Sequence, residues 1–275
     1  MFNVSIADTR NIVGAIYEKS GLDVSAHTMS SMRLRIGKIL NDHNLNDAQV
    51  LISRILEDSD FLDIFIHKIS VGSPDLFRDP DLWVELRDRV IPELLREHAE
   101  FEILVPSSVT GDELYSLAVL LVESGWAQKI RLVTTCLNSK TIDSIQEGFL
   151  SPVRHKTSLE NYRIFNPKGD LEKYLYHSNG RIYKSRELLS QVRILEKKPI
   201  SLPISNRTKM ILFRNRLLYL NQSHKTRILT NIAGRMNTGT YLILGIMESL
   251  KGTGLENELE SVSSDLNIYI KGMDE

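Results

Sequence analysis

The first 72 residues carry apolar side chains at the three- and four-residue spacing that is typical of amphipathic helices. The stretch "SAHTMSSMRLRIGKILNDHNL" places four of them on one helix face: Met32, Ile36, Ile39 and Leu40. The stretch "NDAQVLISRILEDSDFLDIFIHKI" repeats this spacing behind Asn46 or Asp47, either of which can cap a helix. We therefore expect a helical N-terminal domain over residues 1–72, which ends at the helix-breaking "VGSP".

A connecting helix over residues 73–98 leads into a different pattern over residues 99–275, in which short β-like runs alternate with helical stretches. The β-like runs are "FEILV", "IRLVTT", "QVRILE", "KMILF", "TYLILGI" and "LNIYIKG"; the helical stretches are "DELYSLAVLLVES", "SKTIDSIQEG" and residues 223–237. This alternation predicts an α/β domain with a mostly parallel sheet and helices on both faces. The acidic, glycine-containing "KGTGLENELESVSSDL" is expected to be a surface loop.

The stretch "YLYHSNGRIYKS" interrupts this alternation. Tyr176 and Ile182 lie on its two arms, and Asn179-Gly180 between them is a strong signal for a two-residue turn. We expect a small antiparallel β-hairpin subdomain at about residues 172–186, attached to the α/β domain.

The composition limits the classes of function. The 275 residues are 42% hydrophobic and 25% charged, which is typical of a globular protein, and the formal net charge is −1. So small a charge gives no bulk attraction to DNA, RNA or an anionic membrane, and no apolar run approaches the roughly 20 residues that span a bilayer. The single cysteine, Cys136, excludes an internal disulfide. Together with an N-terminus that lacks an apolar signal segment, it favours a cytoplasmic protein.

Ligands of open α/β sheets bind at the carboxyl ends of the strands, so the loop after the first strand is the first candidate site. This loop and the following helix read "VPSSVTGDELYSLA". Thr110 and Glu113 have the spacing of a capping box, and Gly111 and Asp112 suit a first helical turn. A ligand-binding loop is the alternative, and the two roles are compatible because an exposed helix N-terminus can also bind a ligand.

Residues at the ends of two later strands also have two interpretations. Cys136 ends the second strand, where many nucleotide-binding sheets place a carboxylate that accepts from ribose hydroxyls. A thiol is a poor acceptor, so Cys136 is alternatively a small buried hydrophobe. Arg214 and Asn215 directly follow an apolar strand, and they indicate either a binding site or an ordinary loop before a helix capped by Asn221.

Two further groups of basic residues are candidates. Arg78 comes just after the expected domain junction, where it either pairs with a neighbouring aspartate at the surface or points into an interdomain cleft. Arg33, Arg35 and Lys38 lie on the second N-terminal helix. They form either a solvated face or a docking stripe for an acidic partner helix.

Five phrases, in this order and spacing, resemble the chemoreceptor (CheR-type) protein-glutamate O-methyltransferases. They are "PDLFRD", "LWVELRDRVIPELL", "SSVTGDELYSLA", "FRNRLLYL" and "TGTYLILGIMESL", and the resemblance runs from about residue 10 to about residue 250. It implies a class I methyltransferase (Rossmann-like) domain that binds S-adenosylmethionine, and a helical N-terminal domain that helps to dock the receptor. It also implies a hairpin subdomain that in some members captures a receptor tail by strand addition.

The resemblance assigns roles to individual residues. Arg78 and Tyr219 match the arginine and tyrosine that lie near the transferred methyl group, where they orient the substrate carboxylate and support transfer. The positions that match the cofactor site are Ser107, Thr110, Gly111, Glu113, Cys136, Lys198, Arg214 and Asn215.

Several of these positions depart from the family pattern. Ser107 stands where the first loop glycine is expected, and Val109 stands where a serine is expected. Cys136 replaces the ribose-binding aspartate. Lys198 or a neighbour replaces an asparagine near the adenine, and Lys209 replaces an aspartate that often opens the next strand.

Three functions follow as hypotheses. The first is a CheR-like regulatory or protein-binding module of chemosensory signalling with weak or absent S-adenosylmethionine binding, whose partner is a chemoreceptor or another signalling protein. The second is an active S-adenosylmethionine-dependent methyltransferase of receptor glutamates. The third is a cleft adapted to a phosphate-bearing nucleotide, because two lysines replace neutral or acidic groups.

Overall fold

The computed structural model describes residues 4–20, 24–25, 28–70, 75–196, 202–217, 220 and 222–272. The chain divides into two compact units: Met1–Val71 with Arg216–Arg227, and Gly72–Asn215 with Ile228–Glu275. The grouping of a segment from the C-terminal half with the N-terminal helices is not predicted by any local pattern. In the part of the chain that is described, no helix is long and apolar enough to cross a bilayer.

The N-terminal unit consists of helices. They are α1 (Ile6–Ser20), α2 (Met29–Asp42), α3 (Ala48–Glu57) and α4 (Ser59–Ser70). The four apolar residues expected on one face of α2 are all buried, which confirms that face. Asp47, and not Asn46, caps α3, because its carboxylate accepts from the amide of Gln49.

The second unit opens with a helix that contains a wider turn. It runs through α5 (Pro80–Glu85), a π-helical segment (Leu86–Val90) and α6 (Ile91–Glu97). The connecting helix expected over residues 73–98 therefore begins later, at Pro80. Pro92 has no N–H to donate to the residue four positions earlier. The amide of Ile91 donates to the carbonyl of Leu86, five positions back, so the π turn accommodates the proline within one continuous helix.

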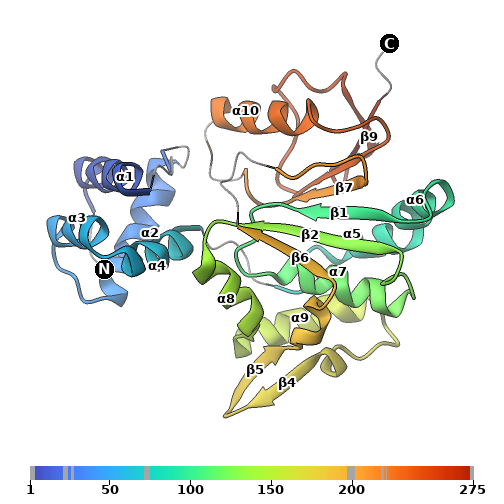
Figure 1. Ribbon diagram of the computed structural model, residues 1–275, viewed down its shortest axis with the longest axis horizontal. Helices are drawn as coiled ribbons and strands as arrows, with labels where there is room; N and C mark the ends of the chain where they lie inside the picture. The colour runs from blue at the N-terminus through green and yellow to red at the C-terminus, as the bar shows by residue number, and fades with distance from the viewer. Residues whose placement is uncertain are drawn as a thin grey trace. The chain divides into compact units, whose positions relative to one another are not determined.

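A seven-stranded sheet forms the centre of this unit, in the order β6-β2-β1-β7-β8-β10-β9 (Figure 1). The strands are β1 (Phe101–Val105), β2 (Ile130–Cys136), β6 (Val192–Glu196), β7 (Thr208–Phe213), β8 (Tyr241–Leu244), β9 (Leu259–Ser263) and β10 (Ile268–Lys271). The strands from β6 to β8 are parallel, and β10 is antiparallel to both of its neighbours. The mostly parallel sheet is confirmed, but the expected surface loop at 251–266 is wrong because it contains β9.

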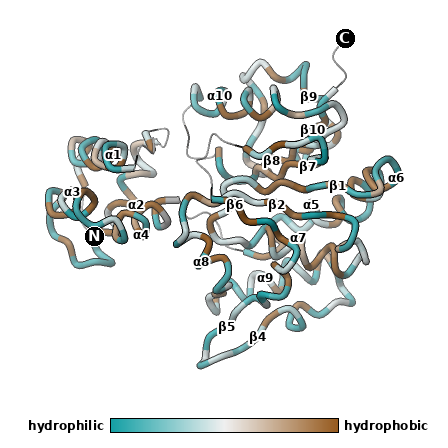
Figure 2. The backbone as a smooth tube through the Cα atoms, viewed as in Figure 1, coloured by the Kyte–Doolittle hydropathy of each residue, from teal (hydrophilic) through white to brown (hydrophobic). Residues whose placement is uncertain are grey.

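Helices cover both faces of this sheet, as the alternation predicted. Figure 1 shows α7 (Asp112–Glu123) on one face and α10 (Gln222–Ala233) on the other; α8 (Ser139–Glu147) and α9 (Pro152–Phe165) lie on the side of α7. Alternate strand residues such as Ile103 and Val105 pack with α7 in one core cluster, whereas Leu104 is buried on the opposite face. The neighbouring strands β1, β7 and β8 are accordingly largely apolar in Figure 2.

A second, smaller sheet has the order β3-β5-β4. Its strands are β3 (Phe149–Leu150), β4 (Leu175–Ser178) and β5 (Arg181–Lys184), and short 3-10 helices at Leu171–Tyr174 and Arg186–Leu189 flank the hairpin. Asn179 and Gly180 both have positive φ, which is the geometry of the predicted two-residue turn. The hairpin is therefore confirmed, and β3 is an addition that the sequence pattern did not indicate.

Candidate functional site

The loop after β1 is fixed to the end of β2. Ser107 has a φ of +53°, in the left-handed region that favours glycine. Its amide donates to Thr135 Oγ1 at 2.7 Å, and the amide of Ser108 donates to the Thr135 carbonyl at 2.8 Å. The loop thus keeps the backbone conformation of a glycine although a serine stands there, and both of these amides bond within the protein.

The start of α7 differs from the predicted capping box. The N-cap is Gly111, at a φ of +73°, and no side chain caps the helix. A Cβ at Gly111 would lie 2.9 Å from Cγ2 of Ile145, so packing as well as φ requires glycine here. Thr110 contributes its carbonyl to a lysine from the hairpin, and Glu113 pairs with an arginine at the end of β7. The capping box expected between Thr110 and Glu113 is therefore wrong.

A buried ion pair joins the hairpin to this helix start. Lys184 Nζ on β5 lies 2.7 Å from Asp112 Oδ1 and 3.2 Å from the carbonyl of Thr110, and it lies above the ring of Tyr115. Both partners are almost fully buried. Asp112 Oδ2 accepts no hydrogen bond from the described residues. Burial raises the pKa of the Tyr115 hydroxyl, which donates to the carbonyl of Ile145.

Arg214 holds three elements together at the carboxyl end of β7. Its side chain is completely buried, and its guanidinium lies 2.5 Å from Asp79 Oδ2 and 3.4 Å from Glu113 Oε1. It also donates to the carbonyl of Arg78 at 3.2 Å and lies 5.7 Å from the centre of the Trp83 ring. Since two carboxylates surround it, its charge is compensated within the protein.

Asn215 continues this edge of the sheet. The backbone N–H groups of Asn215 and Gly245 both donate to Glu248 Oε2, at 2.8 Å and 2.7 Å. One carboxylate thus links the carboxyl ends of β7 and β8. The φ of Asn215 is +56°. A Cβ at Gly245 would lie 2.6 Å from Asn215 Oδ1, which explains why glycine follows β8.

The remaining sequence candidates lie at different depths. The half-buried Arg78 has its Nε 3.9 Å from Asp79 Oδ2, so the expected pairing with a neighbouring aspartate is present. Cys136 is buried at the last position of β2. Lys209 is the second residue of β7, at the amino end of the strand and about 13 Å from its carboxyl end at Phe213. Lys209 therefore does not contribute charge at the carboxyl edge, contrary to the nucleotide hypothesis.

Three residues named in the sequence analysis have no described position. Lys198 and Tyr219, which were expected near the adenine and near the transferred methyl group, lie outside the described residues. Asn221, the expected helix cap, is also outside them. Among the residues that the structure does describe, no group of three or more histidine, cysteine, aspartate or glutamate side chains is arranged to hold a metal ion.

The basic residues of α2 have internal bonds as well as exposed charge. Arg33 Nε donates to the carbonyl of Val4 at 2.7 Å, and Arg35 donates to the carbonyl of Ile69 at 2.5 Å. Lys38 is exposed. The two arginines therefore stabilise the N-terminal unit, and only Lys38 fits the description of a simple solvated face.

Comparison with known proteins agrees with this architecture. The family described as "CheR methyltransferase, SAM binding domain" matches residues 73–268. The chain is 25% identical to "Putative methyltransferase Cher3" of Pseudomonas putida, over 96% of each chain. It is 22% identical to "Chemotaxis protein methyltransferase 1" of Vibrio cholerae, over 98% of each chain.

Among solved structures, an O-methyltransferase family 2 protein of Planctomyces limnophilus is 10% identical, with a TM-score of 0.32 over 92% of this chain and 79% of that chain. The fold assignment rests instead on the strand order, in which five parallel strands are followed by an antiparallel pair, and on the family match. The sheet is that of a class I methyltransferase, and the chain belongs to the CheR methyltransferase family.

Proposed function

We propose that this protein is a receptor-directed signalling protein of the CheR family whose affinity for S-adenosylmethionine is low, and that it acts mainly by binding a protein partner. The observation that carries this proposal is the carboxyl edge of β1 and β2. Ser107 occupies the left-handed position of the loop, and Cys136 ends β2. Neither residue supplies what the resemblance leads one to expect there, which is a glycine and a carboxylate.

The energetic argument is one of lost contacts. A serine Cβ limits how closely a ligand approaches the loop backbone, and the amides of Ser107 and Ser108 already donate to Thr135. A buried thiol replaces the carboxylate that would accept from the ribose hydroxyls. Three lost contacts at about 1–2 kcal/mol each, with Val109 as the third position, weaken binding by about a thousandfold. Because the residues fit the cofactor poorly, we derive no methyl-transfer step.

The hairpin supports the protein-binding half of the proposal. In the small sheet β4 is an edge strand, and Tyr176, His177 and Ser178 are exposed. An exposed edge strand offers unpaired backbone groups to an added strand. Relatives named as chemotaxis protein methyltransferases favour a chemoreceptor segment as the added strand.

An active methyltransferase is the second candidate. It is favoured by the ion cluster of Arg214, Asp79 and Glu113, which joins the carboxyl end of β7 to the starts of α5 and α7 as a preorganised framework. A preorganised framework is what methyl transfer needs, since it depends mainly on positioning. The nucleotide alternative is weaker, because Lys209 lies at the other end of β7.

Two assays on the full chain test the proposal. Binding to the cytoplasmic fragments of the host's chemoreceptors is measured by surface plasmon resonance for His177→Pro and for its control, His177→Ala. Hydrogen-bonded and non-hydrogen-bonded pairs alternate along an antiparallel hairpin, and after a two-residue turn the pair His177–Ile182 is a non-hydrogen-bonded one. The backbone N–H of His177 therefore points away from β5, and proline at this position removes a donor to the added strand. We expect binding by the alanine variant and none by the proline variant; equal binding by both contradicts strand addition at β4.

The same receptor fragments are incubated with S-adenosylmethionine that carries a tritiated methyl group. We expect no base-labile methyl ester above background. Accumulation of ester in proportion to the number of receptor chains would establish the active-enzyme alternative and end the proposal of a weak cofactor site.

A further inference from the structure

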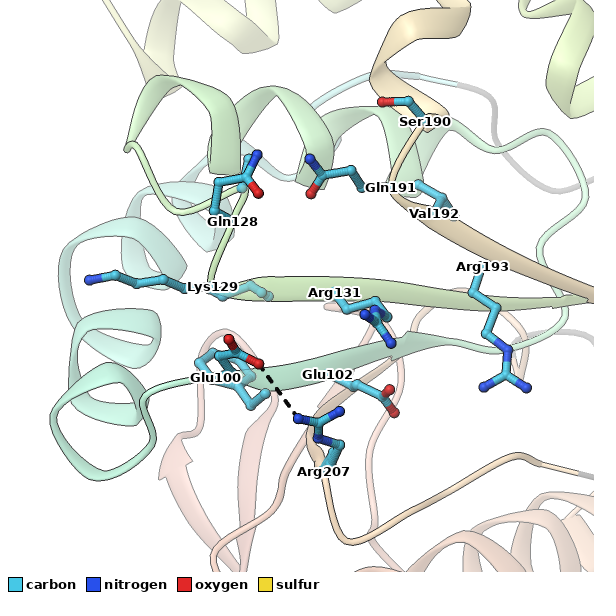
Figure 3. Close-up of a pocket in the computed structure, with 13 residues that line it drawn as sticks. Glu100, Glu102, Gln128, Lys129, Arg131, Ser190, Gln191, Val192, Arg193 and Arg207 are labelled. Carbon is cyan, nitrogen blue, oxygen red and sulfur yellow. Dashed lines mark ion pairs between the residues drawn. The ribbon is translucent and has the colours of Figure 1, made fainter.

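A hollow of about 530 Å³ lies at the amino ends of β1, β2 and β6. Its walls are the start of β1, the turn between α7 and β2, the start of β6, and Arg207 directly before β7 (Figure 3). This volume falls within the range of about 300–1,000 Å³ that is usual for small-molecule sites. Ligands of α/β sheets bind at the carboxyl ends of the strands, so the hollow is distinct from the cofactor position of the family.

Positive charge predominates in the lining. Two carboxylates, Glu100 and Glu102, share the hollow with four cationic side chains: Lys129, Arg131, Arg193 and Arg207. Figure 3 shows Arg131, Arg193 and Arg207 extending from three different segments around the beginnings of β1 and β2. They come from β2, from β6 and from the residue before β7, so the sheet brings together residues that are far apart in the sequence.

Each carboxylate has one polar partner in the described part of the chain, but only Glu100 is ion-paired there. Arg207 lies 3.5 Å from Glu100 Oε2, and Ser205 Oγ donates to Glu102 Oε2 at 3.1 Å. In contrast, neither Arg131 nor Arg193 has an ion pair or a side-chain hydrogen bond with any of the described residues. Both guanidinium groups are therefore available to a ligand, in a hollow whose lining holds two more cationic side chains than carboxylates.

Strand register explains why these two arginines share a face. Glu102 lies opposite Arg131, and Val133, two residues further along β2, lies opposite Arg193. Residues two apart in a strand point to the same face, as do residues directly opposite in neighbouring strands. The pairing of β1, β2 and β6 thus fixes the arrangement of the cluster, and the arginines are not brought together by side-chain flexibility alone.

We propose that this hollow binds a small phosphate-bearing molecule. The planar guanidinium group matches two phosphate oxygens at once, and such charge-assisted bonds are about twice as strong as neutral ones. Arg131 and Arg193 hold the phosphate group, Arg207 moves between Glu100 and the ligand, and the side-chain amides of Gln128 and Gln191 on the opposite wall bind the remainder of the molecule. This site is independent of the proposed function at the carboxyl edge.

Titration calorimetry of the full chain with inorganic pyrophosphate tests the proposal, with Arg131→Gln/Arg193→Gln as the variant. The control, Arg163→Gln/Arg235→Gln, removes the same charge at exposed positions of α9 and of the turn after α10. We expect saturable binding by the natural sequence and by the control, and binding about tenfold to hundredfold weaker by the variant. Thermal unfolding of both variants checks that each is folded.

The outcomes separate clearly. Absence of saturable binding at millimolar pyrophosphate overturns the proposal, as does equal binding by the variant and the control. Citrate, which carries carboxylates in place of phosphates, is titrated in parallel. If citrate binds as tightly as pyrophosphate, the assignment of phosphate as the recognised group is wrong.

Discussion

Lys184 Nζ lies 2.7 Å from Asp112 Oδ1, and both side chains are only 3% exposed. The lysine belongs to β5 of the small sheet, and the aspartate is the first residue of α7, directly after the loop that follows β1. The hairpin proposed to bind the partner and the loop at the candidate cofactor edge are therefore held together by one buried ion pair.

Replacing Lys184 by methionine is expected to destabilise the second unit by about 3–5 kcal/mol, because the change leaves Asp112 buried without its counter-charge. Urea unfolding followed by tryptophan fluorescence measures this unit selectively, since both tryptophans, Trp83 and Trp126, belong to it. The double variant Lys184→Met/Asp112→Leu removes both charges and is expected to lose less stability than the single variant. A loss below about 1 kcal/mol for Lys184→Met would show that the pair is not a structural link.

Ser107→Gly is expected to leave the stability of the second unit unchanged or to raise it by up to about 1 kcal/mol, because a left-handed conformation is unfavourable for serine and not for glycine. The gain is reduced by the greater freedom of glycine in the unfolded chain. Ser107→Val, with a branched Cβ in the same conformation, is expected to be less stable than the natural sequence. The same fluorescence-detected unfolding measures both variants, and a stable valine variant would contradict the left-handed loop.

The half-buried His43 makes the N-terminal unit sensitive to pH. Burial, and secondarily the nearby Lys68 ammonium, lower the pKa of the imidazole. In the unfolded chain the imidazole of His43 therefore binds a proton more readily than in the folded protein. Its contribution to the free energy of unfolding is fully present above about pH 6.5 and is lost as the pH falls toward the pKa of the folded state. We expect an NMR titration to give a His43 pKa below the ordinary value.

The corresponding stability measurement compares urea unfolding by circular dichroism at about pH 7.5 and about pH 5.5 for the natural sequence and for His43→Gln. The glutamine variant should lose less stability on acidification. An equal loss in both proteins would assign the pH dependence to other groups.

Regular periodicity made most of the fold predictable. The alternation of strands and helices predicts the parallel sheet, and Asn179-Gly180 predicts the hairpin. Helix α9 was missed because its apolar residues form no single stripe: Val153 and Ile164 are exposed, whereas Tyr162 is buried. β9 was missed because its sequence is mostly polar and lies at a sheet edge.

The candidate site was less predictable because its contacts are distant in the sequence. Lys184 and Asp112 are 72 residues apart, and Arg214 is 101 residues from Glu113. The family phrases located the loop and the arginine, but a local rule misassigned Thr110 as a cap. Gly111, in a left-handed conformation, occupies the cap position instead.

Calorimetric titration of the natural protein with S-adenosylhomocysteine, the demethylated product of the cofactor, tests the central claim most directly. The geometry at Ser107 and Cys136 predicts a dissociation constant in the millimolar range or no measurable binding. A dissociation constant in the low micromolar range would contradict the account and show that the cofactor site is intact.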